Sequence, residues 1–159
     1  MLNNSIQVLD QATEEVRTIS HNLMPAALME LGLKEALEDM FLKINESKLL
    51  NVKFLMNGIE AHLPSPIEIA VYRVIQEVIN NMIKHSKANL IEVNLQGQGN
   101  ALHLSISDNG VGFEKEMITN SKGLGWKSIF SRIAILKGNI EVDSHPGKGT
   151  NINIQFTIA

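Results

Sequence analysis

The amino-acid sequence predicts an α/β protein in which helices pack on a mixed or mainly antiparallel sheet to form a two-layer sandwich. Segment 65–88 carries apolar residues at three- and four-residue steps, which is typical of an amphipathic helix. Several shorter segments alternate between apolar and polar residues, and these strands occur in runs with helices between them. The expected elements are helices at 3–24, 28–48, 65–88 and 128–136, and strands at 51–57, 89–96, 101–107, 140–142 and 150–158.

The first two helices are predicted from apolar residues at helical spacing in segments 3–24 and 28–48. Pro25 should end or kink the first helix, because proline cannot continue the hydrogen bonding of a helix interior. Gly32 should mark a break within the second helix. The strand at 51–57 follows, and its residues alternate loosely.

The amphipathic helix has a predicted start and a second, polar stripe. Ser65 should be its N-cap, with Pro66 in the first helical position and Glu68 three residues after the cap, which is capping-box spacing. A polar ridge runs beside the apolar stripe, and its members follow at intervals of four residues: Arg73, Glu77, Asn81 and His85. A ridge of this kind is commonly only a solvated surface.

The second half of the chain contains a hairpin and three glycine motifs. Strands 89–96 and 101–107 surround Gly-Gln-Gly-Asn, which is the signal of a hairpin turn. The glycine motifs are D-N-G-V-G at 108–112, G-L-G at 123–125 and G-K-G-T at 147–150. The last of these belongs to the turn His-Pro-Gly-Lys-Gly, which separates the final two strands.

The composition is that of an ordinary globular domain. The 159 residues fit one domain with a helical appendage, and the net charge of −3 gives no reason to expect binding to nucleic acid or an anionic membrane. Cysteine is absent, which excludes disulfides and thiolate metal sites. No apolar run approaches the ~18 residues of a membrane span. We therefore expect a cytoplasmic domain that is not itself inserted in a membrane, even if its parent protein is an anchored receptor.

The order of the motifs, from E-V-I-N-N-M-I-K-H at 77–85 through the three glycine motifs, resembles the ATP-binding domain of the GHKL superfamily. That superfamily includes histidine kinases, gyrase-type ATPases and Hsp90. More narrowly, the sequence resembles the catalytic (HATPase) domain of sensor histidine kinases that pair with LuxR-type response regulators. The resemblance implies a Bergerat-type two-layer sandwich for the ATP-binding catalytic domain at 28–159. It also implies that 1–27 is the C-terminal part of the dimerisation and phosphotransfer helix.

In this family the domain binds ATP with Mg²⁺ and transfers the γ-phosphate to a histidine, from which the receiver domain of a response regulator is phosphorylated. The resemblance thus implies a protein-histidine kinase that is a homodimer in its full-length form. His21 lies close to Pro25, whereas the family's acceptor lies further upstream, in a segment with a His-Asp pair. We therefore expect the acceptor histidine outside this chain, which need not be active alone.

Asn81 is the candidate for holding Mg²⁺, a hard ion that prefers oxygen ligands and keeps several waters. The resemblance assigns the magnesium contact to Asn81. Asn80 is the alternative, although it lies about 100° away around the helix. The resemblance gives Glu77 the role of general base in phosphoryl transfer, and the alternative is a surface carboxylate paired with Arg73.

Lys84 and His85 follow one turn later, where a cation would offset the charge of the triphosphate. His85 could instead interact with the dipole of the helix end. Asp108 ends a strand, so its carboxylate could accept a hydrogen bond from the adenine amine, which is the role that the family implies. Gly110 and Gly112 would let the backbone approach the base closely, although Asp-Asn-Gly alone is more often an ordinary turn.

Segment 113–122 is polar, and we expect it to be an irregular, rather short lid over the nucleotide. Lys122, at its end, could contact phosphate. Trp126 is expected to pack beneath the lid rather than to touch ligand.

The second glycine motif should form an anion site. Gly123, Leu124 and Gly125 are expected to begin a helix whose backbone amides bind phosphate. The family places Thr150 beside the nucleotide pocket. The alternative for the turn before Thr150 is a simple hairpin.

Two other functions remain open at this stage. The first is a GHKL serine kinase of the anti-sigma-factor type, a kind of domain that normally lacks the dimerisation helix expected here. The second is a non-catalytic module in which bound nucleotide only fixes conformation and partner choice. Loss of Glu77 or Asn81 would favour that module, but both residues are present.

Overall fold

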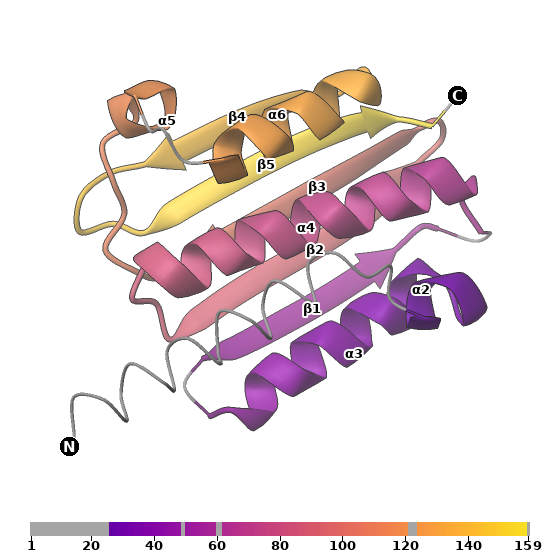
Figure 1. Cartoon of the computed structure of the whole chain (residues 1–159), viewed down its shortest axis with the longest axis horizontal. Helices are drawn as coiled ribbons and strands as arrows, with labels where there is room; N and C mark the ends of the chain where they lie inside the picture. The colour runs from indigo at the N-terminus through magenta and orange to yellow at the C-terminus, as the bar shows by residue number, and fades with distance from the viewer. Residues whose placement is uncertain (1–25, 49, 60–61, 121–123, 159) are drawn as a thin grey trace.

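The computed structural model describes residues 26–48, 50–59, 62–120 and 124–158 (Figure 1). Its helices are α2 (Ala26–Glu30), α3 (Leu33–Glu46), α4 (Ser65–His85), α5 (Glu116–Asn120) and α6 (Leu124–Ile135). Its strands are β1 (Asn51–Asn57), β2 (Leu90–Gln98), β3 (Ala101–Asp108), β4 (Asn139–Ser144) and β5 (Thr150–Thr157).

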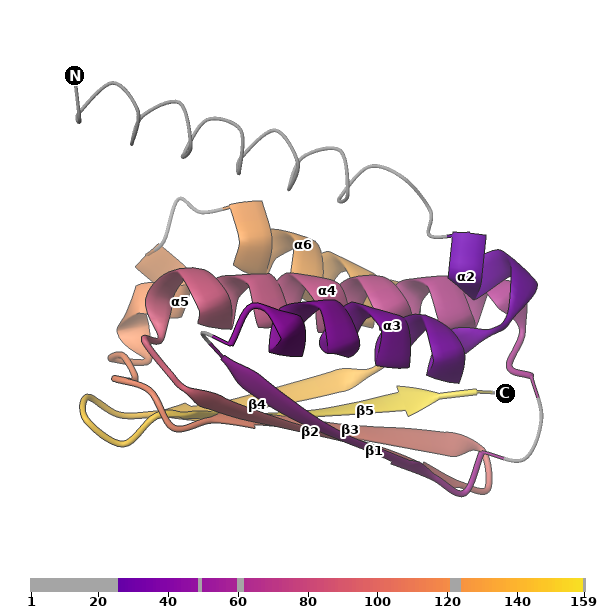
Figure 2. The same ribbon diagram turned by 90° about the horizontal axis from the view of Figure 1, so that it is seen from below.

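The strands form a five-stranded sheet in the order β1-β2-β3-β5-β4. β1 pairs parallel with β2, and the other neighbours are antiparallel. The helices lie together on one face of the sheet, with α4 across its centre, α3 towards the β1 edge and α6 towards the β4 edge (Figures 1 and 2). The predicted two-layer α/β sandwich with a mixed sheet is confirmed.

The core lies between the helix layer and the inner face of the sheet. α4 contributes an apolar stripe that includes Val71, Ile75 and Ile79, each at most 1% exposed. Every second residue of β3 and β5 is buried, and the apolar ones among them are Leu102, Leu104, Ile106, Ile152, Ile154 and Phe156. Because burial of one such side chain contributes ~1.5–3 kcal/mol, this continuous core holds α4 firmly on the sheet.

The opposite face of the sheet is polar, and no helix of the described part of the chain covers it (Figure 2). Its side chains form rows across the strands, one of which contains Gln96, His103, Gln155 and Asn139. Lys53 and Glu92 form an exposed ion pair at 3.5 Å on neighbouring strands. A polar outer face explains why the sandwich stops at two layers, since it offers little apolar surface to a third.

Most boundaries agree with the predictions, and the first strand agrees at both ends. The break at Gly32 is confirmed, because α2 ends at Glu30 and α3 begins at Leu33. The helix predicted at 128–136 begins earlier, at Leu124, because Leu124 and Gly125 of the second glycine motif are already helical.

The predicted capping box at Ser65 is wrong. α4 begins at Ser65 itself with Pro64 as N-cap, and no side chain caps the helix. The reason is that the Pro64 carbonyl already accepts hydrogen bonds from the amides of Ile67 at 2.8 Å and Glu68 at 3.1 Å. The Glu68 carboxylate lies instead 3.6 Å from His62 Nδ1, before the helix.

Several predictions concern residues outside the described ranges: the helix at 3–24, the effect of Pro25 and the place of His21. The division of the chain after residue 27 also stays a prediction. None of the helices in the described ranges is long and apolar enough to cross a membrane.

Candidate functional site

A cavity of about 680 Å³ opens between the second half of α4, segment 112–118 and the start of α6. β3 and β5 contribute Asp108, Thr150 and Ile152 to its wall. Most of the other lining side chains are apolar, among them Val78, Met82, Phe113, Met117, Ile118 and Trp126. A concave apolar pocket with a few polar groups is the usual form of a site for a small organic molecule.

The cavity brings together many of the predicted site residues. Those that line it are Asn81, His85, Asp108, Gly112, Gly125 and Thr150. Lys84 and Gly110 lie next to lining residues but do not line the cavity themselves. Lys122 and Gly123 lie outside the described residues, and Leu124 is placed only as the first residue of α6.

Asp108 presents a buried carboxylate to the cavity. The residue is 8% exposed, and its Oδ1 accepts a hydrogen bond from the Gly110 amide at 2.7 Å. Its Oδ2 is buried and has no hydrogen-bond partner among the residues that the structure describes. Burial raises the pKa of Asp108, while the Gly110 amide and the Thr150 hydroxyl act in the lowering direction. An unpaired buried carboxylate oxygen is costly, and it is suited to accept one hydrogen bond from a ligand.

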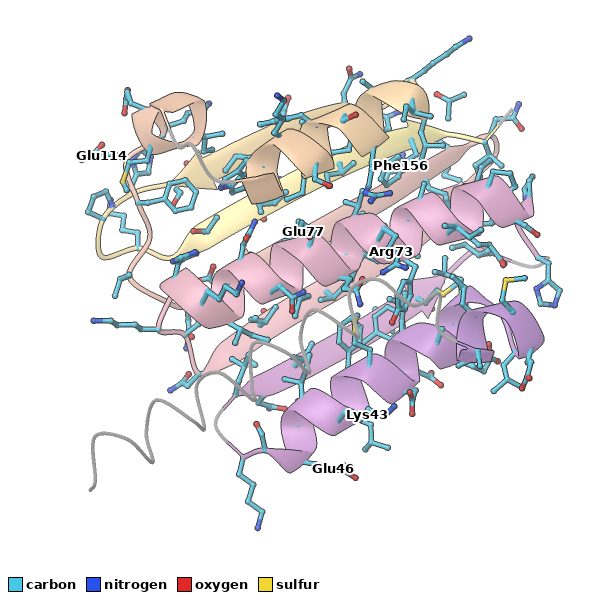
Figure 3. All side chains as sticks on the ribbon, viewed as in Figure 1. Lys43, Glu46, Arg73, Glu77, Glu114 and Phe156 are labelled. Carbon is cyan, nitrogen blue, oxygen red and sulfur yellow. The ribbon has the colours of Figure 1, made fainter. Side chains whose placement is uncertain are left out.

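The polar ridge of α4 faces the start of α6. A Cβ atom at Gly125 would lie 2.9 Å from Glu77 Oε1 and 3.0 Å from both Asn81 amide atoms. Figure 3 shows Glu77 on the part of α4 that lies beside α6. Within the described part of the chain Asn81 Nδ2 is buried without a hydrogen-bond partner. Asn81 and Gly125 therefore meet at one wall of the cavity, and the Glu77 carboxylate lies close to them. Neither Glu77 nor Asn80 lines the cavity itself.

This wall suits Mg²⁺ in a particular way. The described residues contain no group of three or more His, Cys, Asp or Glu side chains that could hold a metal ion. Mg²⁺ is commonly bound through one or two protein oxygens together with substrate phosphates and water. The Asn81 amide oxygen and the neighbouring Glu77 carboxylate supply oxygen donors of this kind, so the residues present fit the ion.

The end of α4 carries two basic side chains, and the structure places them differently relative to the cavity. Lys84 and His85 are both exposed in the last turn, but only His85 lines the cavity. A basic group in the last turn also interacts favourably with the helix dipole. Both predicted readings of His85 therefore agree with its position.

The loop after Asp108 is fastened to the end of α4 and to the start of β2. The Asn109 Oδ1 atom accepts hydrogen bonds from the amides of Asn89 and Leu90, both at 3.1 Å, and its Nδ2 donates to Asn89 Oδ1 at 2.7 Å. The Val111 amide donates to the Ser86 carbonyl at 2.7 Å. These contacts place the loop so tightly that a Cβ at Gly110 would collide with the Ser86 backbone.

The segment predicted to be an irregular lid contains a short helix, α5, so that part of the prediction is wrong. The sequence Glu-Met-Ile-Thr-Asn is long enough for one turn, and short helices of this kind carry no strong periodic signal. Trp126 packs edge-on to Phe113, with ring centroids 6.1 Å apart, and lies 5.9 Å from the Phe130 ring. It packs against the start of the lid segment as expected, but it also lines the cavity.

Sequence reasoning missed the apolar lining and one buried hydroxyl. Phe113 and Met117 belong to the segment predicted to be a polar lid, and Ile152 belongs to the last predicted strand, so no local pattern marks these residues as part of a cavity wall. Ser144 is 3% exposed, and its hydroxyl accepts a hydrogen bond from the Phe113 amide at 2.9 Å. The contact joins residues 31 positions apart, so only the place of Ser144 two residues after a predicted strand could have drawn attention to it.

Comparisons with known proteins identify the family of the chain. The family described as Histidine kinase-, DNA gyrase B-, and HSP90-like ATPase matches residues 67–159. The oxygen sensor histidine kinase NreB of Staphylococcus carnosus (strain TM300) is 29% identical over 151 residues, which cover 95% of this chain and 44% of that protein. The chain therefore spans less than half the length of this relative.

Solved structures of histidine kinases share the fold. The Acinetobacter baumannii histidine kinase AdeS has a TM-score of 0.64 and 19% identity, and the match covers 99% of this chain and 82% of that chain. The histidine kinase domain of the Erythrobacter litoralis EL346 blue-light activated histidine kinase has a TM-score of 0.66 and 20% identity over 79% of this chain and 61% of that one. The chain thus belongs to the histidine kinase-, DNA gyrase B- and HSP90-like ATPase family.

Proposed function

We propose that this domain binds ATP with Mg²⁺ and transfers the γ-phosphate to a histidine of a dimerisation helix, from which a response-regulator receiver domain is phosphorylated. The observation that carries the proposal is the Asp108 carboxylate, whose unpaired Oδ2 belongs to the wall of a cavity that Asn81 also lines. The similarity to NreB, a named histidine kinase, supports the same activity for the parent protein.

Asp108 and its surroundings are the proposed adenine site. The exocyclic amine of adenine would donate to Oδ2, which replaces the missing partner of a buried acceptor. The lining residues Met82, Ile118 and Ile152 would cover the faces of the base. Guanine carries a carbonyl oxygen in place of this amine. That oxygen would face Asp108 Oδ2, and two acceptors cannot form a hydrogen bond with each other.

The triphosphate would extend towards the α4 ridge and the start of α6. Bound Mg²⁺ would be held by Asn81 and phosphate oxygens, and it would neutralise charge on the phosphates. Backbone amides at 123–125 and the side chains of Lys122, Lys84 and His85 would supply further positive potential.

Glu77 is the proposed general base. In the transfer, a nitrogen of the acceptor imidazole attacks the γ-phosphorus, and the bond to the β,γ-bridging oxygen breaks, so that ADP leaves. The Glu77 carboxylate would accept the proton of the attacking imidazole, for which its position beside Asn81 and Gly125 is suitable. We further propose that the parent protein is a homodimer and that this domain works in the cytoplasm.

Calorimetric titration tests the nucleotide site directly. ATP and GTP are titrated with and without Mg²⁺ into the wild type and the variants Asp108→Ala, Asn81→Ala and Asn80→Ala. We expect the wild type to prefer ATP, Asp108→Ala to lose this preference, and Asn81→Ala to lose only the Mg²⁺-dependent part of the affinity. Asn80→Ala is the matched control and should bind as the wild type does. Absence of ATP binding by folded wild-type protein would refute the proposal.

A further inference from the structure

Ser144, the last residue of β4, contacts three parts of the site through one buried hydroxyl. Its Oγ accepts the Phe113 amide proton at 2.9 Å and lies 3.2 Å from the Gly149 carbonyl oxygen and 2.9 Å from Thr150 Oγ1. Ser144 pairs with Thr150 across β4 and β5, and Thr150 pairs with Asp108 across β5 and β3. The three side chains therefore form one buried row that ends at the carboxylate.

The proton of Ser144 has two alternative acceptors. It can go to the Gly149 carbonyl or to the Thr150 hydroxyl, but not to both. If it goes to the carbonyl, Thr150 must donate to Ser144 and has no proton left for Asp108. If it goes to Thr150, the Thr150 proton is free to point towards Asp108.

The same oxygen also fixes the start of the lid segment. The Phe113 amide occupies one acceptor position of Ser144 Oγ, and the Phe113 ring packs on Trp126 in the cavity wall. Ser144 Oγ therefore contacts both the start of the lid segment and the Thr150 hydroxyl, and it influences the position of the first and the direction of the second.

We infer that Ser144 is a positioning residue that couples the lid segment to base recognition by Asp108. The inference rests on the proposed nucleotide site and adds a specificity role to it. With nucleotide bound, Ser144 donates to Thr150, and Thr150 donates to Asp108. The carboxylate then stays ionised and oriented to accept the amine of a 6-aminopurine. A 6-oxopurine has no such amine, so these hydrogen bonds do not increase its affinity. Ser144 therefore increases the selectivity for 6-aminopurine over 6-oxopurine nucleotides.

The test compares ATP with inosine triphosphate, which has an oxygen in place of the amine. Ser144→Ala should lower the ratio of ATP affinity to inosine triphosphate affinity about 3–10-fold, as the loss of one buried hydrogen bond predicts. It should also speed hydrogen exchange of the Phe113 amide in the nucleotide-free protein. Ser105→Ala, which removes a half-buried hydroxyl elsewhere in the sheet, is the matched control and should change neither quantity.

The outcomes separate the inference from the proposed function. If the wild type binds ATP and folded Ser144→Ala keeps the same affinity ratio, the inference alone is wrong. If folded wild-type protein binds neither nucleotide, the proposed function fails and the inference fails with it. Should Ser144→Ala not fold, Ser144→Cys preserves the size of the side chain with a much weaker hydrogen-bonding group. It should then show the same fall in the ratio, and an unchanged ratio would refute the inference.

Discussion

Asp108 and Thr150 face each other across β3 and β5, as the last residue of one strand and the first residue of the next in the sheet. Both residues are buried, at 8% and 6% exposure. The carboxylate proposed to recognise the base is therefore placed by the register of two central strands rather than by a loop. Groups supported by rigid elements are held more closely in a functional geometry than groups on loops.

Asp108 should cost stability at neutral pH. Since burial raises its pKa in the folded protein, the folded state keeps this proton to a higher pH than the unfolded chain does. The free energy of unfolding therefore falls as pH rises from the ordinary pKa to the raised one. Asp108→Asn should raise Tm by about 1–3 °C near pH 7, and it should abolish the preference for ATP. Thermal unfolding at several pH values checks this, with exposed Glu141→Gln as control, and a lower Tm for Asp108→Asn at pH 7 would contradict it.

Gly125→Ala should separate stability from nucleotide binding. Alanine favours a helix over glycine by up to ~1 kcal/mol, and the three atoms nearest to the new Cβ are at the movable ends of Glu77 and Asn81. We expect unchanged or slightly raised stability, together with a loss of about tenfold in Mg²⁺-dependent ATP affinity as these side chains are displaced. Urea unfolding and calorimetry measure the two effects. Ser131→Ala, on the exposed side of α6, is the control, and wild-type affinity in Gly125→Ala would show that the ridge is not part of the site.

Gly149 and Gly147 provide a matched pair in one turn. Both have positive φ, at 73° and 79°, but a Cβ at Gly149 would collide with the Asp108 backbone, whereas a Cβ at Gly147 would meet nothing within 4 Å. Gly147→Ala should therefore show only the conformational cost of about 1 kcal/mol. Gly149→Ala adds a steric clash, and we expect a total loss of about 3 kcal/mol or more. Chemical denaturation of both variants gives the difference, and equal losses would mean that the turn moves freely away from Asp108.

Asn109 should stabilise the loop that carries the glycines after Asp108. Its side chain makes three hydrogen bonds to Asn89 and Leu90. Since each such bond contributes ~0.5–1.5 kcal/mol in net terms, Asn109→Ala should lose about 1–2 kcal/mol of stability and weaken ATP binding severalfold. Asn100→Ala, in the turn between β2 and β3, should stay within about 0.5 kcal/mol of the wild type. A stable Asn109→Ala variant would indicate that backbone contacts alone hold the loop.

The fold was largely predictable because its main elements have strong periodic patterns. α4 has a regular apolar stripe, and β1, β2 and β3 alternate between apolar and polar residues and are bounded by clear turns. The type of each element and its order along the chain therefore follow from the spacing of the apolar residues. The start of α4 was less predictable, because Ser65 and Glu68 have the residue types of a capping box while the Pro64 carbonyl makes the actual contacts. Local sequence patterns do not show which group accepts the hydrogen bonds of the first amides of a helix.

The polar residues of the site were predicted better than its apolar wall. Asp108 and Asn81 occupy distinctive motifs, and both line the cavity. Phe113 and Trp126 line it too, but their rings meet through a contact between the lid segment and the start of α6, which no local pattern encodes. Ser144 is a further example, since its partners come from the loop after β3 and from the start of β5.

The position of β5 has a consequence for how the protein is made. β5 is the last strand in chain order, yet it lies inside the sheet, between β3 and β4. During synthesis on the ribosome, β3 therefore lacks one neighbour, and Asp108 lacks Thr150, until β5 has emerged. A nascent chain that stops before residue 150 carries the α4 ridge and Asp108, the proposed base-recognition group, without the strand that supplies Thr150. The domain should accordingly acquire nucleotide binding in one step, once β5 has emerged and paired with β3.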